Sequence, residues 1–207
     1  MVKPLEYPCT LAKTEPEVFI IESLSVADEI RERYDGRALR DNLRITGLKP
    51  AYYYVRNASE LNNALEMFRH SGYRFLHLSL HGSVNSIFTT LEEIPNNDFA
   101  EMCYEKLKNR RIFFSACEVG SGGLNILLRN NNKGMYSIAA PQDKISFGTA
   151  CAFWTAFYTK ALSDNPLGME ANKLRPVLQK LCGFFGIRLS WSYYTPTSDK
   201  WNEFTIE

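Results

Sequence analysis

The sequence lacks the features that mark disulfide-stabilised, metal-binding or membrane-spanning proteins. Its five cysteines form no C-x-x-C pair, so neither a disulfide framework nor a zinc site is indicated. No apolar run is long enough to span a bilayer, and residues 1–10 contain no apolar core of signal-peptide length. We therefore expect a cytoplasmic protein with no cofactor, no metal or calcium site and no contact with a membrane.

A strong excess of one charge is also absent. The formal net charge is +1, whereas nucleic-acid-binding proteins usually carry a basic excess or stripe. The glycine-rich stretch 120–123 lacks the Gly-Lys-Ser/Thr ending of a phosphate-binding P-loop, so nucleotide binding is rejected. Neither a nucleic acid nor a nucleotide is expected as a partner.

The chain does contain ample material for one hydrophobic core. Of its 207 residues, 45% are hydrophobic and 13% are aromatic, which suits a single domain of ordinary upper size. Residues 1–17 include three prolines and are expected to form an extended lead-in. A single domain is expected over residues 18–207.

Apolar runs of strand length alternate along the chain with segments of helical periodicity. The expected strands are 18–21, 51–55, 75–80, 112–116 and 136–140. The expected helices are 25–34, with Ser25 as its cap, a segment that follows a capping-box pattern at 57–60 and ends at Gly72, and 97–107, 124–128, 147–162 and 169–181. Segment 37–46 is either a further helical turn or a loop, and 87–94 is a small hairpin. This order predicts an α/β fold with a mostly parallel sheet and right-handed crossovers.

The last strand is expected to differ from the others. Residues 187–194 alternate between apolar and polar side chains, which is typical of a half-exposed strand at the edge of a sheet. An exposed edge around Trp191 would offer a surface through which a homodimer could pair.

Two strands of the predicted sheet end in reactive side chains. The run 75–80 leads into His81 and Gly82, and the run 112–116 leads into Cys117, with Gly120 shortly after it. Because the carboxyl ends of parallel strands meet at one edge of a sheet, imidazole and thiol would share a crevice there. That is the arrangement of a nucleophile and its general base.

A structural role must be weighed for each of these residues. A lone buried cysteine is usually unreactive, and a lone histidine in a strand is usually a hydrogen-bonded core residue. Their pairing at two strand ends, each with a glycine, favours catalysis. His77 lies on the same face of its strand as His81 but about 13 Å further back, so it is expected to be structural.

Two motifs resemble those of the caspase-like cysteine peptidases, most closely the CHAT branch. They are Leu80-His81-Gly82-Ser83 and Phe114-Ser115-Ala116-Cys117-Glu118-Val119-Gly120, with a weaker match at 138–143. The resemblance implies a three-layer sandwich, with helices on both faces of the sheet. It also implies Cys117 as nucleophile, His81 as general base and acid, and the N–H groups of Gly82 and Cys117 as oxyanion donors.

The same resemblance names three residues for substrate binding. Relatives that cleave after basic residues often carry an acid at the position of Ser115, so trypsin-like specificity is in doubt here. Glu118 would contact substrate or hold a turn, and Asp143 would form a wall of the first specificity pocket or cap the next helix. The chain lacks the Gln-Ala-Cys-Arg-Gly signature of caspases, so strict cleavage after aspartate is not implied.

The resemblance implies an endopeptidase that performs limited proteolysis of a protein through an acyl-thioester intermediate. In bacteria such proteases often act in antiviral defence or cell death, commonly by activating a pore-forming effector encoded nearby. The alternative is a catalytically silent caspase-like module that binds a partner through the same crevice.

Overall fold

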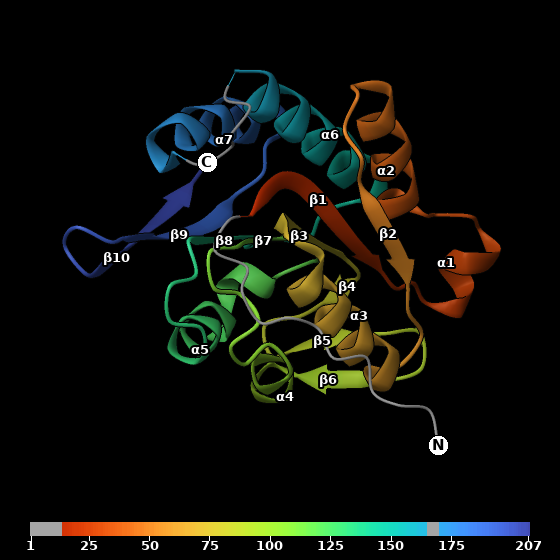
Figure 1. The fold of residues 1–207 in the computed structure, drawn as a ribbon. Helices are drawn as coiled ribbons and strands as arrows, with labels where there is room; N and C mark the ends of the chain where they lie inside the picture. Colours follow the sequence, from red (N-terminus) through yellow and green to blue (C-terminus); the bar gives the residue numbers. More distant parts are fainter. Residues whose placement is uncertain (1–13, 165–169) are drawn as a thin grey trace.

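A computed structural model describes residues 14–164 and 170–207, and in this part of the chain a seven-stranded sheet lies between two layers of helices (Figure 1). The strands lie side by side in the order β10 (Lys200–Ile206), β9 (Leu189–Thr195), β8 (Ser137–Pro141), β7 (Arg111–Ser115), β3 (Tyr73–Ser79), β1 (Glu15–Glu22) and β2 (Ala51–Tyr54). The first strand begins at Glu15, three residues before the expected start.

Five strands, β8, β7, β3, β1 and β2, run parallel to one another. Strand β9 is antiparallel to both of its neighbours, β8 and β10. The predicted α/β sandwich with a mostly parallel sheet is therefore confirmed. Strand β3 pairs directly with β7, and Ser79 lies opposite Ser115 at their carboxyl ends. The chain segments that leave these two strands consequently start from neighbouring positions.

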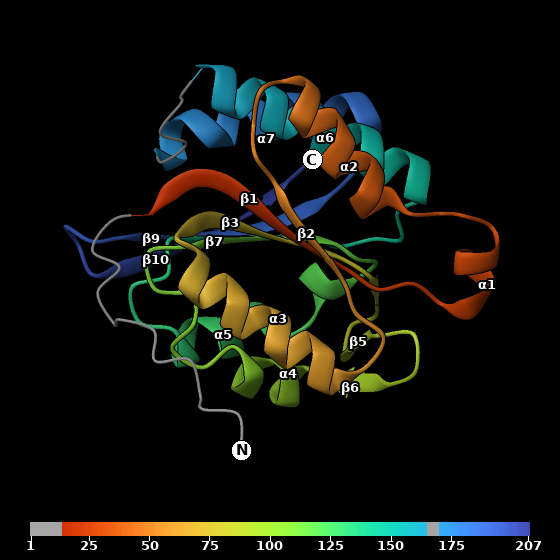
Figure 2. The same ribbon diagram turned by 45° about the vertical axis from the view of Figure 1, so that its right-hand side comes forward.

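Both faces of the sheet are covered by helices, which explains why the central strands are apolar on both sides. Figure 2 shows three helices on one face, α2 (Asp35–Ile45), α6 (Phe147–Asp164) and α7 (Ala171–Phe185). The other face carries α3 (Ala58–Ser71), α4 (Asn96–Met102) and α5 (Leu124–Asn131). Each layer packs a separate cluster of buried apolar side chains against the sheet.

The aromatic side chains of α6 belong to the core. Trp154 and Tyr158 are buried and pack edge-on against Phe113 of β7 and against His77 of β3. The Tyr158 hydroxyl lies 3.2 Å from His77 Nδ1. Burial lowers the pKa of His77 to about 3, which confirms a neutral structural histidine.

Local capping signals were predicted correctly. The Asn57 side chain accepts a hydrogen bond from the Glu60 N–H at the start of α3, and Gly72 ends that helix with a φ of 76°. The Ser25 side chain likewise accepts from the Asp28 N–H at the start of α1 (Val26–Ile30). These caps lie close in sequence to the groups they satisfy.

The single helix expected over residues 25–34 is wrong. Helix α1 ends at Ile30, and α2 begins at Asp35, so segment 37–46 is largely helical. The Glu22 carboxylate of β1 accepts hydrogen bonds from the N–H groups of Gly36 and Arg37 and thereby satisfies the first turn of α2. The capping residue, Glu22, lies in a different element, so no local sequence pattern predicts this cap.

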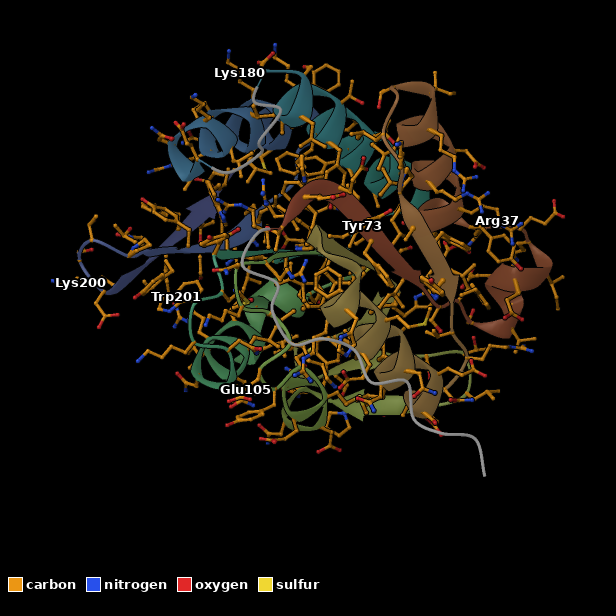
Figure 3. The ribbon with its side chains drawn as sticks, viewed as in Figure 1. Arg37, Tyr73, Glu105, Lys180, Lys200 and Trp201 are labelled. Carbon is orange, nitrogen blue, oxygen red and sulfur yellow. The ribbon has the colours of Figure 1, made fainter. Side chains whose placement is uncertain are left out.

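The expectation of a final edge strand around Trp191 is also wrong. Strand β9 is internal, because it pairs with β8 on one side and with β10 on the other, and Trp191 is 1% exposed. The edges of the sheet are β10 and β2. Figure 3 shows Lys200 and Trp201 of β10 near the far end of the β9–β10 hairpin.

His81 does not lie in the central sheet. Strand β3 ends at Ser79, and His81 begins a separate three-stranded sheet of β4 (His81–Gly82), β5 (Ser86–Phe88) and β6 (Glu93–Pro95). Its last two strands contain the hairpin expected at 87–94. No helix in the described part of the chain is long and apolar enough to cross a membrane.

The short 3-10 helix η1 (Val119–Ser121), which follows Cys117, depends on a close backbone approach. A Cβ added at Gly120 would lie 2.3 Å from the carbonyl oxygen of Ala140, whereas a Cβ at Gly123 would meet nothing within 4 Å. We predict that Gly120→Ala lowers the free energy of unfolding by about 1–3 kcal/mol. The matched Gly123→Ala change should alter it by less than about 0.5 kcal/mol. Denaturant unfolding checks both, and equal effects would contradict this packing constraint.

Candidate active site

His81 is held in place by a carboxylate and an aromatic ring. Its Nε2 atom lies 2.8 Å from Oδ2 of Asp28 in α1, and its ring packs edge-on against Phe147 at the start of α6. A carboxylate only accepts hydrogen bonds, so Nε2 is the donor. In the neutral ring this leaves Nδ1 as the basic nitrogen.

Asp28 is itself held by neighbours on both oxygens. Ser25 donates to Oδ2 at 2.5 Å, and Arg33 donates to Oδ1 at 3.2 Å. Burial raises the pKa of Asp28, but the hydrogen bonds from Ser25 and His81 outweigh it and hold the pKa below its ordinary value. The carboxylate is therefore ionised at neutral pH, and it fixes the orientation of the His81 ring.

Cys117 follows β7 by two residues and is held by the loop between β8 and α6. The Ile145 N–H donates to Cys117 Sγ at 3.4 Å, and the Ile145 carbonyl oxygen lies 3.6 Å from the same sulfur. Cys117 is partly exposed, whereas Cys103 and Cys182 are buried.

His81 and Cys117 line one small cavity of about 80 Å³. That the two side chains would share a crevice was predicted from their place at the carboxyl ends of two parallel strands. In the structure each residue lies two positions beyond the end of its strand in the central sheet. The other lining residues are Asp35, Leu80, Ser115, Ile145, Phe147 and Ala150. Larger hollows exist elsewhere in the described residues, but neither of these two side chains lines them.

Gly82 brings the two loops together. A Cβ on this residue would lie 2.5 Å from Val119 Cγ2 and 2.9 Å from the Cys117 carbonyl oxygen. The space beside Gly82 is filled by the protein's own Cys117 loop. The absence of a side chain at 82 is therefore required by internal packing.

Two backbone N–H groups near the cavity, those of Gly82 and Cys117, are candidate hydrogen-bond donors. The Ser83 N–H donates to the Ser86 carbonyl, so the alternating pattern of an antiparallel pair leaves Gly82 at a non-hydrogen-bonded position opposite Ile87. The Gly82 N–H thus points away from β5. Among the described residues, none provides a hydrogen-bond acceptor for the Cys117 N–H.

Ser115 and a buried acid pair lie beneath the cavity. The Ser115 hydroxyl donates to Asp35 Oδ2 at 2.9 Å, and the Ser79 hydroxyl donates to Asp35 Oδ1 at 2.5 Å. Glu22 lies beside this carboxyl and accepts from Tyr52 at 2.6 Å as well as from the first turn of α2. Burial and the charge of Asp35 raise the pKa of Glu22 to about 7, and burial also raises the pKa of Asp35.

The other two predicted substrate residues lie outside the cavity lining. Glu118 adopts a left-handed conformation with a φ of 58°, and its N–H donates to the Asp143 carbonyl, so it forms part of a turn. The Asp143 carboxylate pairs with Arg188 at 2.6 and 2.8 Å. The idea that Asp143 caps α6 is wrong, because Ser146 accepts the hydrogen bond from the Thr149 N–H.

Sequence reasoning missed Asp28, Asp35, Ile145 and Phe147. Ser25 was expected to cap a helix, and Asp28 three residues later fits the first turn of such a helix, but nothing in the pattern connected it to a histidine 53 positions away. Asp35 lay between the expected helix 25–34 and segment 37–46, so it was assigned to no element. No group of three or more histidine, cysteine, aspartate or glutamate side chains in the described residues is arranged to hold a metal ion.

The sequence matches no protein-family description and no curated protein. Its fold is similar to that of solved structures of cysteine proteases. A secreted C11 cysteine protease from Bacteroides thetaiotaomicron, iotapain, matches with a TM-score of 0.59 at 9% identity, over 88% of this chain and 67% of that one. The Arg-specific cysteine proteinase gingipain R matches with a TM-score of 0.53 at 11% identity, over 84% of this chain and 44% of that one.

The chain has a caspase-like fold. Caspase-1 from Spodoptera frugiperda also aligns, with a TM-score of 0.49 at 14% identity, over 86% of this chain and 83% of that one. These identities are low, so the likeness concerns the arrangement of the sheet and helices. The chemistry has to be argued from the residues at the cavity.

The raised pKa of Glu22 predicts a pH-dependent stability. The folded protein keeps a proton that the unfolded chain releases near pH 4.5, so stability is lost as the pH rises from 4.5 through about 7. We expect the free energy of unfolding to fall by roughly 1–3 kcal/mol between pH 5 and pH 8. Urea titrations of Glu22→Gln should show a flatter profile, and the exposed Glu93→Gln variant should keep the original slope. Parallel slopes for all three proteins would contradict the assignment.

Proposed function

We propose that this chain is a cysteine endopeptidase with Cys117 as nucleophile and His81 as general base and acid. The observation that carries the proposal is that both side chains line one cavity, where His81 Nε2 is bonded to the Asp28 carboxylate. The caspase-like fold supports it, because the solved cysteine proteases have the same general architecture. Asp28 acts as a positioning residue.

The first step is a proton transfer within the cavity. Because Nε2 is held as a donor to Asp28, the lone pair on His81 Nδ1 is available to take the proton of the Cys117 thiol. The imidazolium that results is stabilised by the adjacent carboxylate. The Ile145 N–H, 3.4 Å from Sγ, is positioned to donate a hydrogen bond to the sulfur as the proton leaves.

The thiolate then attacks the carbonyl carbon of the scissile peptide bond. The oxyanion that forms accepts hydrogen bonds from the N–H groups of Gly82 and Cys117. Collapse of this intermediate expels the amine, which takes the proton from His81, and leaves an acyl thioester on Cys117. His81 next removes a proton from water, and hydroxide displaces Sγ from the acyl group, so that a carboxylic acid and the free thiol are released.

The substrate is a protein, and the cleavage is limited proteolysis. The motifs around His81 and Cys117 resemble those of the CHAT branch, so we infer membership of that branch and a role in bacterial antiviral defence or cell death. A pore-forming effector encoded nearby is the partner that this relationship suggests. The relatives named above are described as a secreted protease and an Arg-specific proteinase, and the chain spans 44% of the length of the latter.

Replacement of the catalytic pair should abolish cleavage. Co-expression with proteins encoded by neighbouring genes, followed by mass spectrometry of the product termini, is expected to reveal one defined cut by the unmodified chain. Cys117→Ala and His81→Ala should lower its rate by at least about 1000-fold. Cys151→Ala is the matched control, because Cys151 is also partly exposed but does not line the cavity.

The proposal requires that Cys117→Ala and His81→Ala lose the cut while Cys151→Ala keeps it. A cut that persists in Cys117→Ala would exclude this thiol as the nucleophile. If folded protein cuts no candidate and iodoacetamide modifies Cys117 no faster than Cys151, the result would favour the catalytically silent interaction module.

Replacement of Asp28 should make His81 a weaker general base without removing its imidazole. In Asp28→Asn the charge that stabilises the imidazolium is lost, so we expect a 10- to 1000-fold lower kcat. The pH profile of iodoacetamide reactivity at Cys117 should also shift, which a merely structural residue would not cause. Asp28→Glu should restore part of the activity, whereas Asp98→Asn, an exposed acid on α4, should behave like the unmodified chain. An unchanged pH profile in Asp28→Asn would remove Asp28 from the mechanism.

A further inference from the structure

One of the larger cavities lies at the opposite edge of the central sheet from the candidate active site. Its volume is about 580 Å³, which is the size of a small-molecule site, and it opens at the amino ends of the parallel strands β3, β7 and β8. Described residues in its lining include Arg74 of β3, Arg111 at the start of β7 and Tyr136 just before β8. None of its described lining residues also lines the cavity beside Cys117.

Positive charge is concentrated around this cavity. Arg74 and Arg111 line it although they are only 7% and 3% exposed, and the neighbouring Arg110 is 2% exposed. Burial lowers the pKa of Arg111 to about 9 and that of Arg110 to about 10, and the charge of Arg74 lowers both pKa values as well. All three side chains remain cationic at neutral pH, so their charges repel one another. An anion bound in the cavity would relieve this repulsion.

Both arginine side chains in the lining are held in place by hydroxyl groups. Arg74 Nε donates to Thr14 Oγ1 at 2.7 Å, and Arg111 Nη1 donates to Ser137 Oγ at 2.8 Å. The Arg111 guanidinium also lies 5.6 Å from the centre of the Tyr136 ring. A guanidinium that is already held in one orientation loses less side-chain entropy when it binds an anion. These contacts therefore prepare the two side chains for a ligand.

The start of helix α7 adds a further source of positive potential. Ala171 and Asn172, the first two residues of this 15-residue helix, also line the cavity. N–H groups in the first turn of a helix have no acceptor within it, and the Glu170 side chain at the N-cap position does not cap them. Glu170 is the one acid among the described lining residues, and its exposed carboxylate pairs with Lys173 at 3.4 Å. The net charge of the described lining is therefore positive.

The chemistry of the lining indicates which kind of anion would fit. Donors converge from β3, β7 and α7, which is more than the two oxygens of a single carboxylate require. A phosphate ester has three terminal oxygens, and both arginine side chains and helix N-termini bind phosphate well. Tyr136, Tyr193 and Tyr194 also line the cavity and offer aromatic surface to a flat ring.

We propose that this cavity binds a small phosphate ester with an aromatic body. Arg74, Arg111 and the first turn of α7 hold the phosphate, and the three tyrosines pack against the ring. The glycine-rich stretch 120–123 takes no part, so its lack of a P-loop ending does not bear on this site. The site is separate from His81 and Cys117, so the inference does not depend on the proposed peptidase function.

The experiment titrates the full chain with simple probes in an isothermal titration calorimeter. The probes are naphthyl phosphate, inorganic phosphate, naphthol and naphthoate, each raised to millimolar concentration. Naphthyl phosphate should bind at least about 10-fold tighter than inorganic phosphate or naphthoate, because it alone satisfies both the arginine side chains and the aromatic surface. Naphthol should show no saturable binding. Failure of naphthyl phosphate to bind, or an equal affinity for naphthoate or for inorganic phosphate, would overturn the proposal.

Variants of the lining locate the binding. Asn172→Asp adds a negative charge to the cavity at a helix position that tolerates acids, and it should weaken naphthyl phosphate binding at least about 10-fold. Gln179→Glu adds the same charge at an exposed position of α7 outside the lining and should leave binding unchanged. Arg111→Gln should lose saturable binding, whereas Arg44→Gln, an exposed arginine of α2, should keep it. Equal effects of Asn172→Asp and Gln179→Glu would contradict the assigned site, and this comparison decides even if Arg111→Gln does not fold.

Discussion

The parallel pairing of β3 with β7 is the constraint on which the candidate site depends. Their register places Ser79 opposite Ser115, so the segments that carry His81 and Cys117 leave the sheet at the same level. Parallel strands have their carboxyl ends at the same edge of the sheet. The segments that follow the adjacent strands β3 and β7 each bring one reactive side chain to that edge. The buried aromatic side chains of α6 pack against both of these strands.

A second constraint is the close approach of backbone segments around that edge. Gly82 packs against the carbonyl of Cys117, Gly120 against the carbonyl of Ala140, and Gly122 against the carbonyl of Val84. Each contact joins two segments that are distant in sequence, and none leaves room for a side chain. The backbone that follows Cys117 is therefore packed closely against its neighbours.

The sequence was informative wherever the cause of a structure is local. The apolar runs of β3 and β7, the cap at Asn57 and the turn at Gly72 follow from residues close together in the chain, and all were predicted. The start of α2 was not, because its cap is the side chain of Glu22 in another strand. Strand β10 was missed because its apolar residues do not alternate regularly, and without it β9 was taken for an edge. The partner of His81 was missed for the same reason as the α2 cap, since Asp28 meets it only in the folded chain.

The excursion between β1 and α2 brings two separate carboxylates to the candidate site. Asp28 comes from α1, within this excursion, and Asp35 stands at its end, where α2 begins. Both acidic groups beside the two reactive side chains therefore come from one short stretch of the chain. An insertion or deletion between β1 and α2 would displace both carboxylates in a single event, whereas the strands that lead to His81 and Cys117 could remain unchanged.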